Sequence, residues 1–313
     1  MSSQKRLTLF VEDALSKEDD SVPLQTVAAQ CQSPSHPSNH ITRLAESKLP
    51  RTRSRYPVKR LPGEVRLVPV ISGSPWNHYE RKYRLDGGSS FGIIIPRDGK
   101  GRQSMIRTIS GSNLDEQIQN IRQLSHENIV KNIEIYISSD QDYYLISEFM
   151  PVSLMHLCQA PIYPTEPQLG SILHQVLMGV EFLLTHGLVH EQLSCANVLM
   201  DFDGDVKICD IEHCSSSGKV AKLRDSFSRM VMRLMDKKKD KEATVGLTQP
   251  QNWSRDAFEL FTMTTTSPNI KELLEHKFME KKDKQKLIWL VPAILMTAYH
   301  RIEFDTSTQG APL

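Results

Sequence analysis

Apolar residues change their spacing along the chain, and this change divides its central region into two parts. Between residues 79 and 150, short apolar runs alternate with polar turns, a pattern that predicts β-strands. Five such runs lie at residues 83–85, 91–95, 104–109, 133–137 and 143–149. After the third run, Leu114, Ile118, Ile121 and Leu124 recur every three or four residues behind an N-cap at Ser112 or Asn113. This spacing predicts one amphipathic helix beside a five-stranded sheet.

Helical spacing dominates after Pro151. Apolar residues between positions 169 and 184 line one face of a long helix, which we expect to end at Gly187. Residues 197–210 interrupt the helices and predict a β-hairpin that turns at Asp203–Gly204. The region from 79 to 280 is therefore predicted to be α+β, with a small strand-rich part (79–150) and a larger, mainly helical part (151–280).

The two ends of the chain lack this regularity. Residues 1–63 are rich in Ser, Gln, Pro and His, which is typical of a disordered arm. Within the arm, residues 48–60 carry basic but no acidic side chains, and a solvated linker fits them better than a targeting or phosphate-docking segment. Residues 64–78 leave room for an extra N-terminal strand.

Residues 281–313 form a C-terminal extension that contains an apolar run at 287–299. This run is shorter than the roughly 20 residues that cross a bilayer. We expect it to fold back onto the helical part, and a partner-binding helix is the alternative.

Composition narrows the classes of function. The chain has 313 residues, 39% of them hydrophobic, which is enough for a globular core, and its net charge of +1 gives no overall attraction to nucleic acid or an anionic membrane. The five cysteines include no C-x-x-C pair and fit a reducing compartment better than a disulfide framework or a zinc site. The apolar run at 7–11 is broken too early for a secretory signal. We expect a cytoplasmic or nuclear protein with protein partners, and the sequence carries no signal of its oligomeric state.

Two neighbouring segments carry the most specific pattern. Residues 190–199, HEQLSCANVL, resemble the H-R-D-L-x-x-x-N catalytic loop of protein kinases, and residues 205–212, DVKICDIE, resemble their D-F-G segment at the family's spacing. Residues 124–130 and 271–278 are similar to the link between helix αC and the next strand and to the family's last helix. The chain from Tyr79 to Phe278 thus resembles the eukaryotic-type, serine/threonine-like protein kinases. This resemblance implies a two-lobed fold with ATP and Mg²⁺ as ligands.

The catalytic loop departs from the family pattern. The aspartate that orients the substrate hydroxyl and accepts its proton is replaced by Gln192, whose amide is no base near neutral pH. The lysine two positions later is replaced by Ser194. The resemblance therefore leaves no catalytic residue, unless Glu191 or Glu212 replaces the lost base.

The nucleotide site departs as well. The resemblance assigns this site to Gly87, Gly92, Met105, Arg107, Glu148, Met150 and Leu199. Met105 replaces a small alanine and should crowd the adenine pocket, and Ser89 replaces the second glycine of the phosphate loop. Arg107 replaces the lysine that binds the phosphates. Its usual glutamate partner falls on Gln117, although the neighbouring Glu116 could be recruited by a local shift.

Asn197 and Asp210 match the family's magnesium ligands. They could instead be polar residues that cap the hairpin, and Arg107 could pair with Asp210 or Glu212 and so fill the phosphate site. Binding of ATP and Mg²⁺ is thus left open by the resemblance. His190 is expected to be structural and to pack beneath the metal motif.

The segment that should present a peptide substrate is short. The stretch from Glu212 to Asp225, where the next helix is expected to begin, has no A-P-E motif, and the arginine that would pair with that motif is replaced by Ser267. We favour a pseudokinase that acts as a binding, scaffolding or regulatory module. The alternatives are a weak or unconventional serine/threonine kinase and a kinase-like phosphotransferase on a non-protein substrate.

Overall fold

The computed structural model describes residues 67–86, 90–111, 113–138, 142–237, 244–266, 269–298 and 302–304. All of them belong to one compact unit, residues 60–313. The arm expected at 1–63, with its basic stretch at 48–60, lies outside the described residues, as do Gly87, Ser89 and Ser267.

The small lobe contains a mixed seven-stranded sheet and one helix, α1 (Leu114–Gln123). The strands, in spatial order, are β1 (Val70–Ser72), β5 (Asn132–Ile137), β6 (Tyr143–Glu148), β4 (Ser104–Ile109), β3 (Ser90–Pro96), β2 (Tyr79–Asp86) and β10 (Ile302–Phe304). The five predicted strands and the helix are confirmed, but the prediction of a five-stranded sheet was wrong. β1 adds in parallel to β5 at one edge, and β10 adds antiparallel to β2 at the other. Each added strand has three residues, too few to show an alternation of apolar and polar positions. These strands form because a sheet edge offers unpaired backbone groups.

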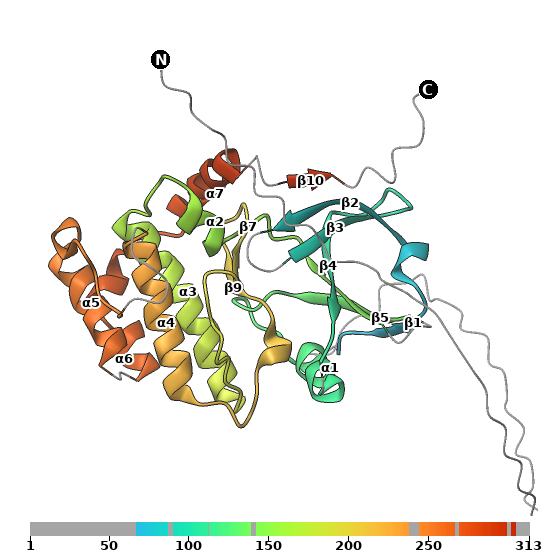
Figure 1. The fold of residues 1–313 in the computed structure, drawn as a ribbon, viewed down its shortest axis with the longest axis horizontal. Helices are drawn as coiled ribbons and strands as arrows, with labels where there is room; N and C mark the ends of the chain where they lie inside the picture. The colour runs from blue at the N-terminus through green and yellow to red at the C-terminus, as the bar shows by residue number, and fades with distance from the viewer. Residues whose placement is uncertain are drawn as a thin grey trace, which may run out of the picture. The chain divides into compact units, whose positions relative to one another are not determined.

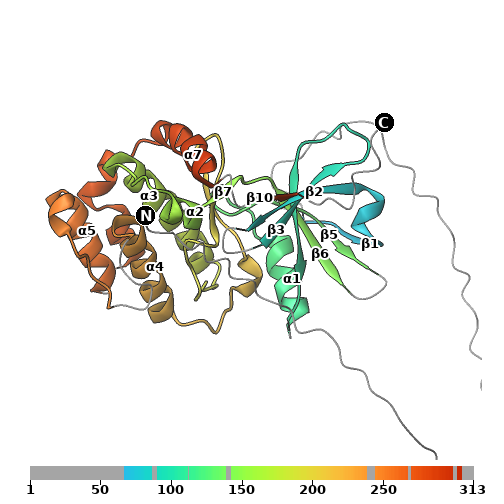
Figure 2. The same ribbon diagram turned by 45° about the horizontal axis from the view of Figure 1, so that its top comes forward.

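The large lobe is mainly helical and contains a small three-stranded sheet (Figures 1 and 2). Its helices are α2 (Leu154–Gln159), α3 (Glu166–Thr185), α4 (Val220–Met235), α5 (Arg255–Thr265), α6 (Ile270–Leu274) and α7 (Gln285–Ala298). Short 3-10 turns lie at η2 (Ile211–His213), η3 (Pro250–Asn252) and η4 (Lys277–Lys281), and another, η1 (Pro75–Asn77), lies in the small lobe. The small sheet has the order β7 (Val152–Ser153), β8 (Val198–Met200) and β9 (Val206–Ile208). The α+β, two-lobed fold class is thus confirmed.

The predicted hairpin is the pair β8–β9, which turns at Gly204. Gly204 has a φ of 76°, and a Cβ there would lie 2.9 Å from the carbonyl oxygen of Lys284. Glycine is required at this position because it tolerates both the left-handed backbone and the close approach.

Two helix boundaries differ from expectation. Helix α4 begins at Val220 and not near Asp225. Leu223 is buried four residues before the buried Phe227, so the apolar face already starts ahead of Asp225. The predicted last helix divides into α6 and η4 at His276, where the ring Nδ1 accepts a hydrogen bond from the backbone N–H of Phe278.

The apolar C-terminal run forms helix α7, which contacts α2, α3 and β7. The run therefore folds back onto the large lobe, as predicted. Leu287, Val291 and Ile294 are fully buried there, while Pro292 faces outward. In the part of the chain that the structure describes, no helix is both long and apolar enough to cross a bilayer.

Candidate functional site

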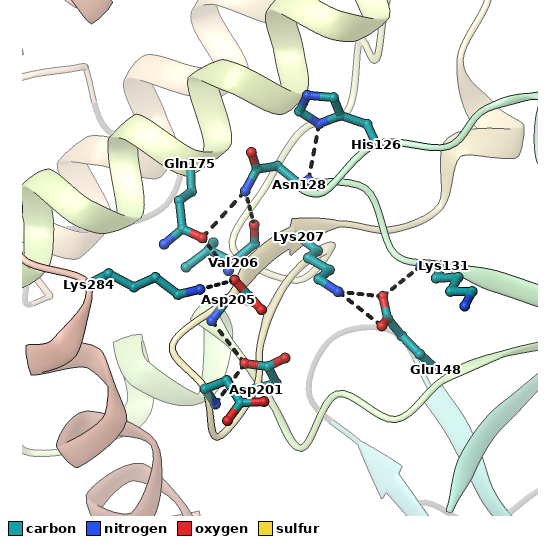
Figure 3. Close-up of polar contacts among 11 residues, drawn as sticks. His126, Asn128, Lys131, Glu148, Gln175, Asp201, Asp205, Val206, Lys207 and Lys284 are labelled. Atoms are coloured by element: carbon teal, nitrogen blue, oxygen red, sulfur yellow. Dashed lines mark hydrogen bonds and ion pairs between the residues drawn. The ribbon is translucent and has the colours of Figure 1, made fainter. Parts of the chain in front are cut away.

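Backbone hydrogen bonds join the two lobes behind the cleft. The N–H of Val130 donates to the carbonyl oxygen of Ile208 and the N–H of Ile208 donates to that of Asn128, both at 2.9 Å. The Asn128 side-chain amide also donates to the carbonyl oxygen of Val206, at 3.1 Å, and lies 3.4 Å from the Gln175 Oε1 (Figure 3). The hairpin that precedes Asp210 is therefore fixed directly to the small lobe.

Glu148, predicted to line the nucleotide site, directs its carboxylate to this joint. Its oxygens accept hydrogen bonds from Lys207 Nζ at 2.9 and 3.0 Å, and Oε1 also accepts one from the backbone N–H of Lys131 at 2.7 Å (Figure 3). The side chain thus links β6 to β9, and the backbone N–H of Glu148 also donates to the carbonyl oxygen of Lys131 at 3.0 Å.

Arg107 and Glu212 form a largely buried ion pair between the lobes. The two terminal nitrogens of Arg107 donate to the two carboxylate oxygens of Glu212, the Nη2 bond measuring 2.8 Å. Nη2 also lies 3.4 Å from Asp210 Oδ1. The side chain of Glu212 is 1% exposed and that of Arg107 is 14% exposed. A bidentate pair of this kind gives the strongest hydrogen bonds available to either group.

The ion pair sets the charge of both residues. Burial alone would raise the pKa of Glu212, but the hydrogen bonds and charge of Arg107 outweigh it and hold this pKa below its usual value. Burial likewise opposes ionisation of Arg107, yet the hydrogen bonds and charge of Glu212 raise the pKa of its guanidinium. Glu116 is exposed, so the local shift proposed for it is absent, and the buried Gln117 Oε1 has no hydrogen-bond partner among the described residues.

Asp210 has an unusual backbone. Its φ is 59°, and among the described residues no other non-glycine residue has a positive φ. This left-handed conformation begins the turn η2, which carries Glu212 towards Arg107 and contacts α1. An aspartate tolerates the conformation better than most residues, and strain at such a position commonly marks a functional or formerly functional site.

Asn197 uses both ends of its amide to hold its own loop. Its Oδ1 accepts a hydrogen bond from the N–H of Ser194 at 2.8 Å, and its Nδ2 donates to the carbonyl oxygen of Gln192 at 2.9 Å. Beneath the loop, His190 is 1% exposed with Nε2 3.3 Å from the carbonyl oxygen of Cys209, and burial lowers its pKa. These contacts are structural, as expected for His190.

A magnesium ion fits this arrangement poorly. Mg²⁺ is held by hard oxygen ligands, chiefly carboxylates. Here the Asp210 carboxylate lies next to a guanidinium, and the Asn197 oxygen already accepts a backbone hydrogen bond. Among the described residues, no group of three or more His, Cys, Asp or Glu side chains could hold a metal ion.

Side chains fill the region expected to receive the adenine. Met105, Met150 and Leu199, all predicted there, are each 2% exposed or less. They belong to one apolar cluster, the cleft cluster, whose buried members are Phe91, Ile93, Met105, Val130, Met150, Leu199 and Cys209. A cavity of about 10 Å³ remains beside Phe91, Arg107 and Asp210. That space suits one water molecule and not a nucleobase.

A larger pocket opens beyond the end of the β3–β4 pairing. It has a volume of about 400 Å³, and its lining includes Arg81, Arg84, Gly92, Arg107 and Asp210. A larger residue would fit poorly at Gly92, because a Cβ there would lie 2.9 Å from Ile106 Cγ2. The pocket is predominantly cationic, so a phosphate group is the chemistry that it could accept.

The two glutamates considered as replacement bases are both engaged. Glu212 binds Arg107, as described above. Glu191 accepts hydrogen bonds from the backbone N–H of Lys219 at 2.6 Å and from Lys222 Nζ at 2.9 Å, and these contacts lower its pKa. Gln192 is exposed, so the base position presents an amide to solvent.

Sequence reasoning missed Phe91, Val130 and Cys209 as members of the cleft cluster, and the Glu148–Lys207 pair. Strand alternation offered a signal for Phe91, which shares a face with Ile93 two residues later. The Glu148–Lys207 pair joins residues far apart in the chain and had no local signal.

Comparisons with known proteins agree with this geometry. A family model described as protein kinase domain matches residues 100–234. The chain is 26% identical over 157 residues to the serine/threonine-protein kinase STE20 of Debaryomyces hansenii. This alignment covers 47% of this chain and 14% of that protein. It is 33% identical over 95 residues to the mitogen-activated protein kinase sty1 of Schizosaccharomyces pombe. That alignment covers 30% of this chain and 27% of that protein. The chain thus aligns with only a minor part of these relatives' length, and the similarity to the eukaryotic-type protein kinases lies in its kinase-like region, residues 100–234 in the family model.

Proposed function

We propose that this chain is a pseudokinase that acts as a binding, scaffolding or regulatory module for protein partners in the cytoplasm or nucleus. The observation that carries the proposal is the Arg107–Glu212 ion pair. It joins the position of the phosphate-binding lysine to that of the glycine of the D-F-G motif. A guanidinium held by a buried carboxylate has little capacity left for the phosphates of ATP.

Three further features support the proposal. The cleft cluster fills the adenine region with apolar side chains. Position 192 supplies an amide where phosphoryl transfer needs a carboxylate to orient the attacking hydroxyl. The carboxylates of Glu191 and Glu212 are bound to cations that lower their pKa values, so neither is poised to accept a proton at neutral pH.

A weak, unconventional serine/threonine kinase is the second candidate. The left-handed Asp210 and the cationic pocket beside Arg107 favour it, because a phosphate could enter there without displacing the cleft cluster. This candidate predicts phosphotransfer that depends on Asp210.

Two measurements on the full chain test the proposal. Thermal unfolding with ATP, with and without Mg²⁺, should show almost no stabilisation of the wild type, because a ligand stabilises a protein only in proportion to its binding. A phosphotransfer assay on a generic protein substrate should show no turnover that Asp210→Ala removes. Strong stabilisation by ATP that is lost in Arg107→Ala would refute the filled site, and turnover that requires Asp210 would refute the pseudokinase.

A further inference from the structure

Two cysteines from separate parts of the large lobe lie in contact. Cys158 lies on α2 and is partly exposed, whereas Cys195 lies in the 190–197 loop and is 1% exposed. Their sulfur atoms are 3.6 Å apart. The sequence indicated no disulfide framework, and the separation of these residues along the chain gave no signal that they meet.

The backbone on both sides of the two thiols is already held. The N–H of Met155 donates to the carbonyl oxygen of Cys195 at 2.7 Å, and Ser153 pairs with Leu199 in the small sheet. A disulfide has an S–S distance of about 2.05 Å, so closing the gap requires a movement of about 1.5 Å. Because the backbone contacts hold α2 against the loop, the disulfide needs this movement chiefly from the two side chains.

The surroundings favour attack by Cys158. Contact with the Cys195 thiol and the charges of Arg233 and Lys237 lower the pKa of Cys158, although burial opposes them. The same contact and burial raise the pKa of Cys195. Burial also raises the pKa of Cys214 to about 12 and raises that of Cys209. Of the cysteines that the structure describes, Cys158 is thus the one that is partly exposed and has a lowered pKa, and both features favour reactivity.

We propose that Cys158 and Cys195 form a modification site at which a hydroperoxide closes a reversible disulfide. The Cys158 thiolate attacks the peroxide O–O bond and becomes a sulfenic acid, and with hydrogen peroxide the leaving hydroxide takes a proton to form water. The Cys195 sulfur then attacks the sulfenic sulfur, the S–S bond forms, and the Cys158 oxygen leaves with the Cys195 proton as a second water molecule. A dithiol reductant reverses the change and is itself oxidised to its disulfide.

The disulfide would tie α2 to the loop that positions Asn197. Helix α2 directly follows β7, which pairs with β8 at the other end of that loop. Oxidation would therefore restrict movement between α2 and the former catalytic loop. This inference does not depend on the pseudokinase proposal, since it uses no nucleotide or catalytic residue.

The experiment uses the full chain, reduced and then treated with near-stoichiometric hydrogen peroxide. Free thiols are alkylated, and peptides are mapped by mass spectrometry without reduction. We expect a cross-linked peptide pair containing Cys158 and Cys195, with two of the five thiols lost and both recovered after dithiothreitol. Cys158→Ser and Cys195→Ala should each abolish the cross-link, whereas the matched buried control Cys214→Ala should keep it.

Two further readouts separate the proposal from simple oxidation damage. In Cys195→Ala, the Cys158 sulfenic acid should persist and react with dimedone, whereas in the wild type the disulfide should protect it. The oxidised wild type should also unfold at a higher temperature than its reduced form, a shift absent in Cys158→Ser. Retention of all thiols, a cross-link to another cysteine, or equal sulfinic acid formation at Cys158 in wild type and Cys195→Ala would each overturn the inference.

Discussion

The Arg107–Glu212 ion pair should contribute strongly to folding stability, and a double-mutant cycle can measure it. Glu212→Ala leaves a guanidinium with 14% exposure whose remaining carboxylate partner among the described residues is Asp210, at 3.4 Å. Arg107→Met leaves a carboxylate with 1% exposure and no cation. Removing one partner of a buried pair destabilises a protein by about 3–5 kcal/mol. We expect Glu212→Ala near the lower limit, because Asp210 still compensates part of the charge.

The double variant Arg107→Met/Glu212→Leu tests whether the pair acts as a unit. Apolar side chains of similar volume can replace a buried ion pair with little loss of stability. The loss in the double variant should therefore be smaller than the sum of the two single losses, giving a coupling energy of about 2–4 kcal/mol.

The pH dependence of the cycle supplies an independent check. The pKa of Glu212 in the folded protein lies below its ordinary value of 4.5. The unfolded state therefore binds more protons between these two pKa values, and stability rises with pH across that interval. The contribution of Glu212 should be fully present above pH 4.5 and be lost as the pH falls through the folded pKa, so the difference between wild type and Glu212→Gln should shrink in acid.

Chemical denaturation followed by far-UV circular dichroism measures each free energy of unfolding. The exposed pair Lys222–Glu191, whose lysine side chain is 62% exposed, provides the matched control, and Lys222→Met should change stability by less than about 1 kcal/mol. Single losses at Arg107 and Glu212 that are no larger than this control, with no coupling, would refute the reasoning.

Three other substitutions test separate contacts. Met105→Ala should destabilise the protein by about 2–5 kcal/mol, because Met105 is 1% exposed in the cleft cluster. Calorimetry on this variant should detect no tight ATP binding, because Arg107 stays paired with Glu212. Tight binding would show that Met105 alone blocks the site. Lys237→Met should lower the unfolding free energy by about 1–3 kcal/mol, since its ammonium donates to the carbonyl oxygens of Leu157, Ala160 and Ile162; an unchanged midpoint would contradict this. Glu148→Gln should speed hydrogen exchange at the backbone amides of Val130 and Ile208, because it weakens the contact with Lys207. Unchanged exchange would show that the backbone hydrogen bonds hold the two lobes together without this contact.

Much of the fold follows from local spacing. The regular apolar periods of α3 and β4 and the Asp203–Gly204 turn place these elements correctly, because each signal lies within one element. The edge strands β1 and β10 lack such a local signal, although the sequence left room for a strand at 64–78, where β1 lies. Each has three residues and exists through pairing with a partner far away in the chain, with β5 in one case and β2 in the other.

The site was predictable as a set of positions but not as a set of contacts. The motif spacing located Gln192, Asn197 and Asp210, and the presence of an acid at 212 suggested a pair with Arg107. Only the three-dimensional arrangement distinguishes Glu212, which binds both terminal nitrogens, from Asp210, which lies at 3.4 Å. The contact between Cys158 and Cys195 had no signal at all, because neither the helix period nor the motif relates them.

Several contacts join the two lobes beside the positions where a kinase holds its nucleotide. In a working kinase, the nucleotide lies between the lobes and contributes to holding them together. Here the ion pair from Arg107 to Glu212 crosses between the lobes, and the cleft cluster includes residues of both. The C-terminal extension adds another connection. It contains α7, which packs on the large lobe, and β10, which pairs with β2 and places Ile302 opposite Leu85. The proposed pseudokinase therefore predicts that Gln192→Asp alone gives no phosphotransfer, because the Arg107–Glu212 pair and the cleft cluster remain in place.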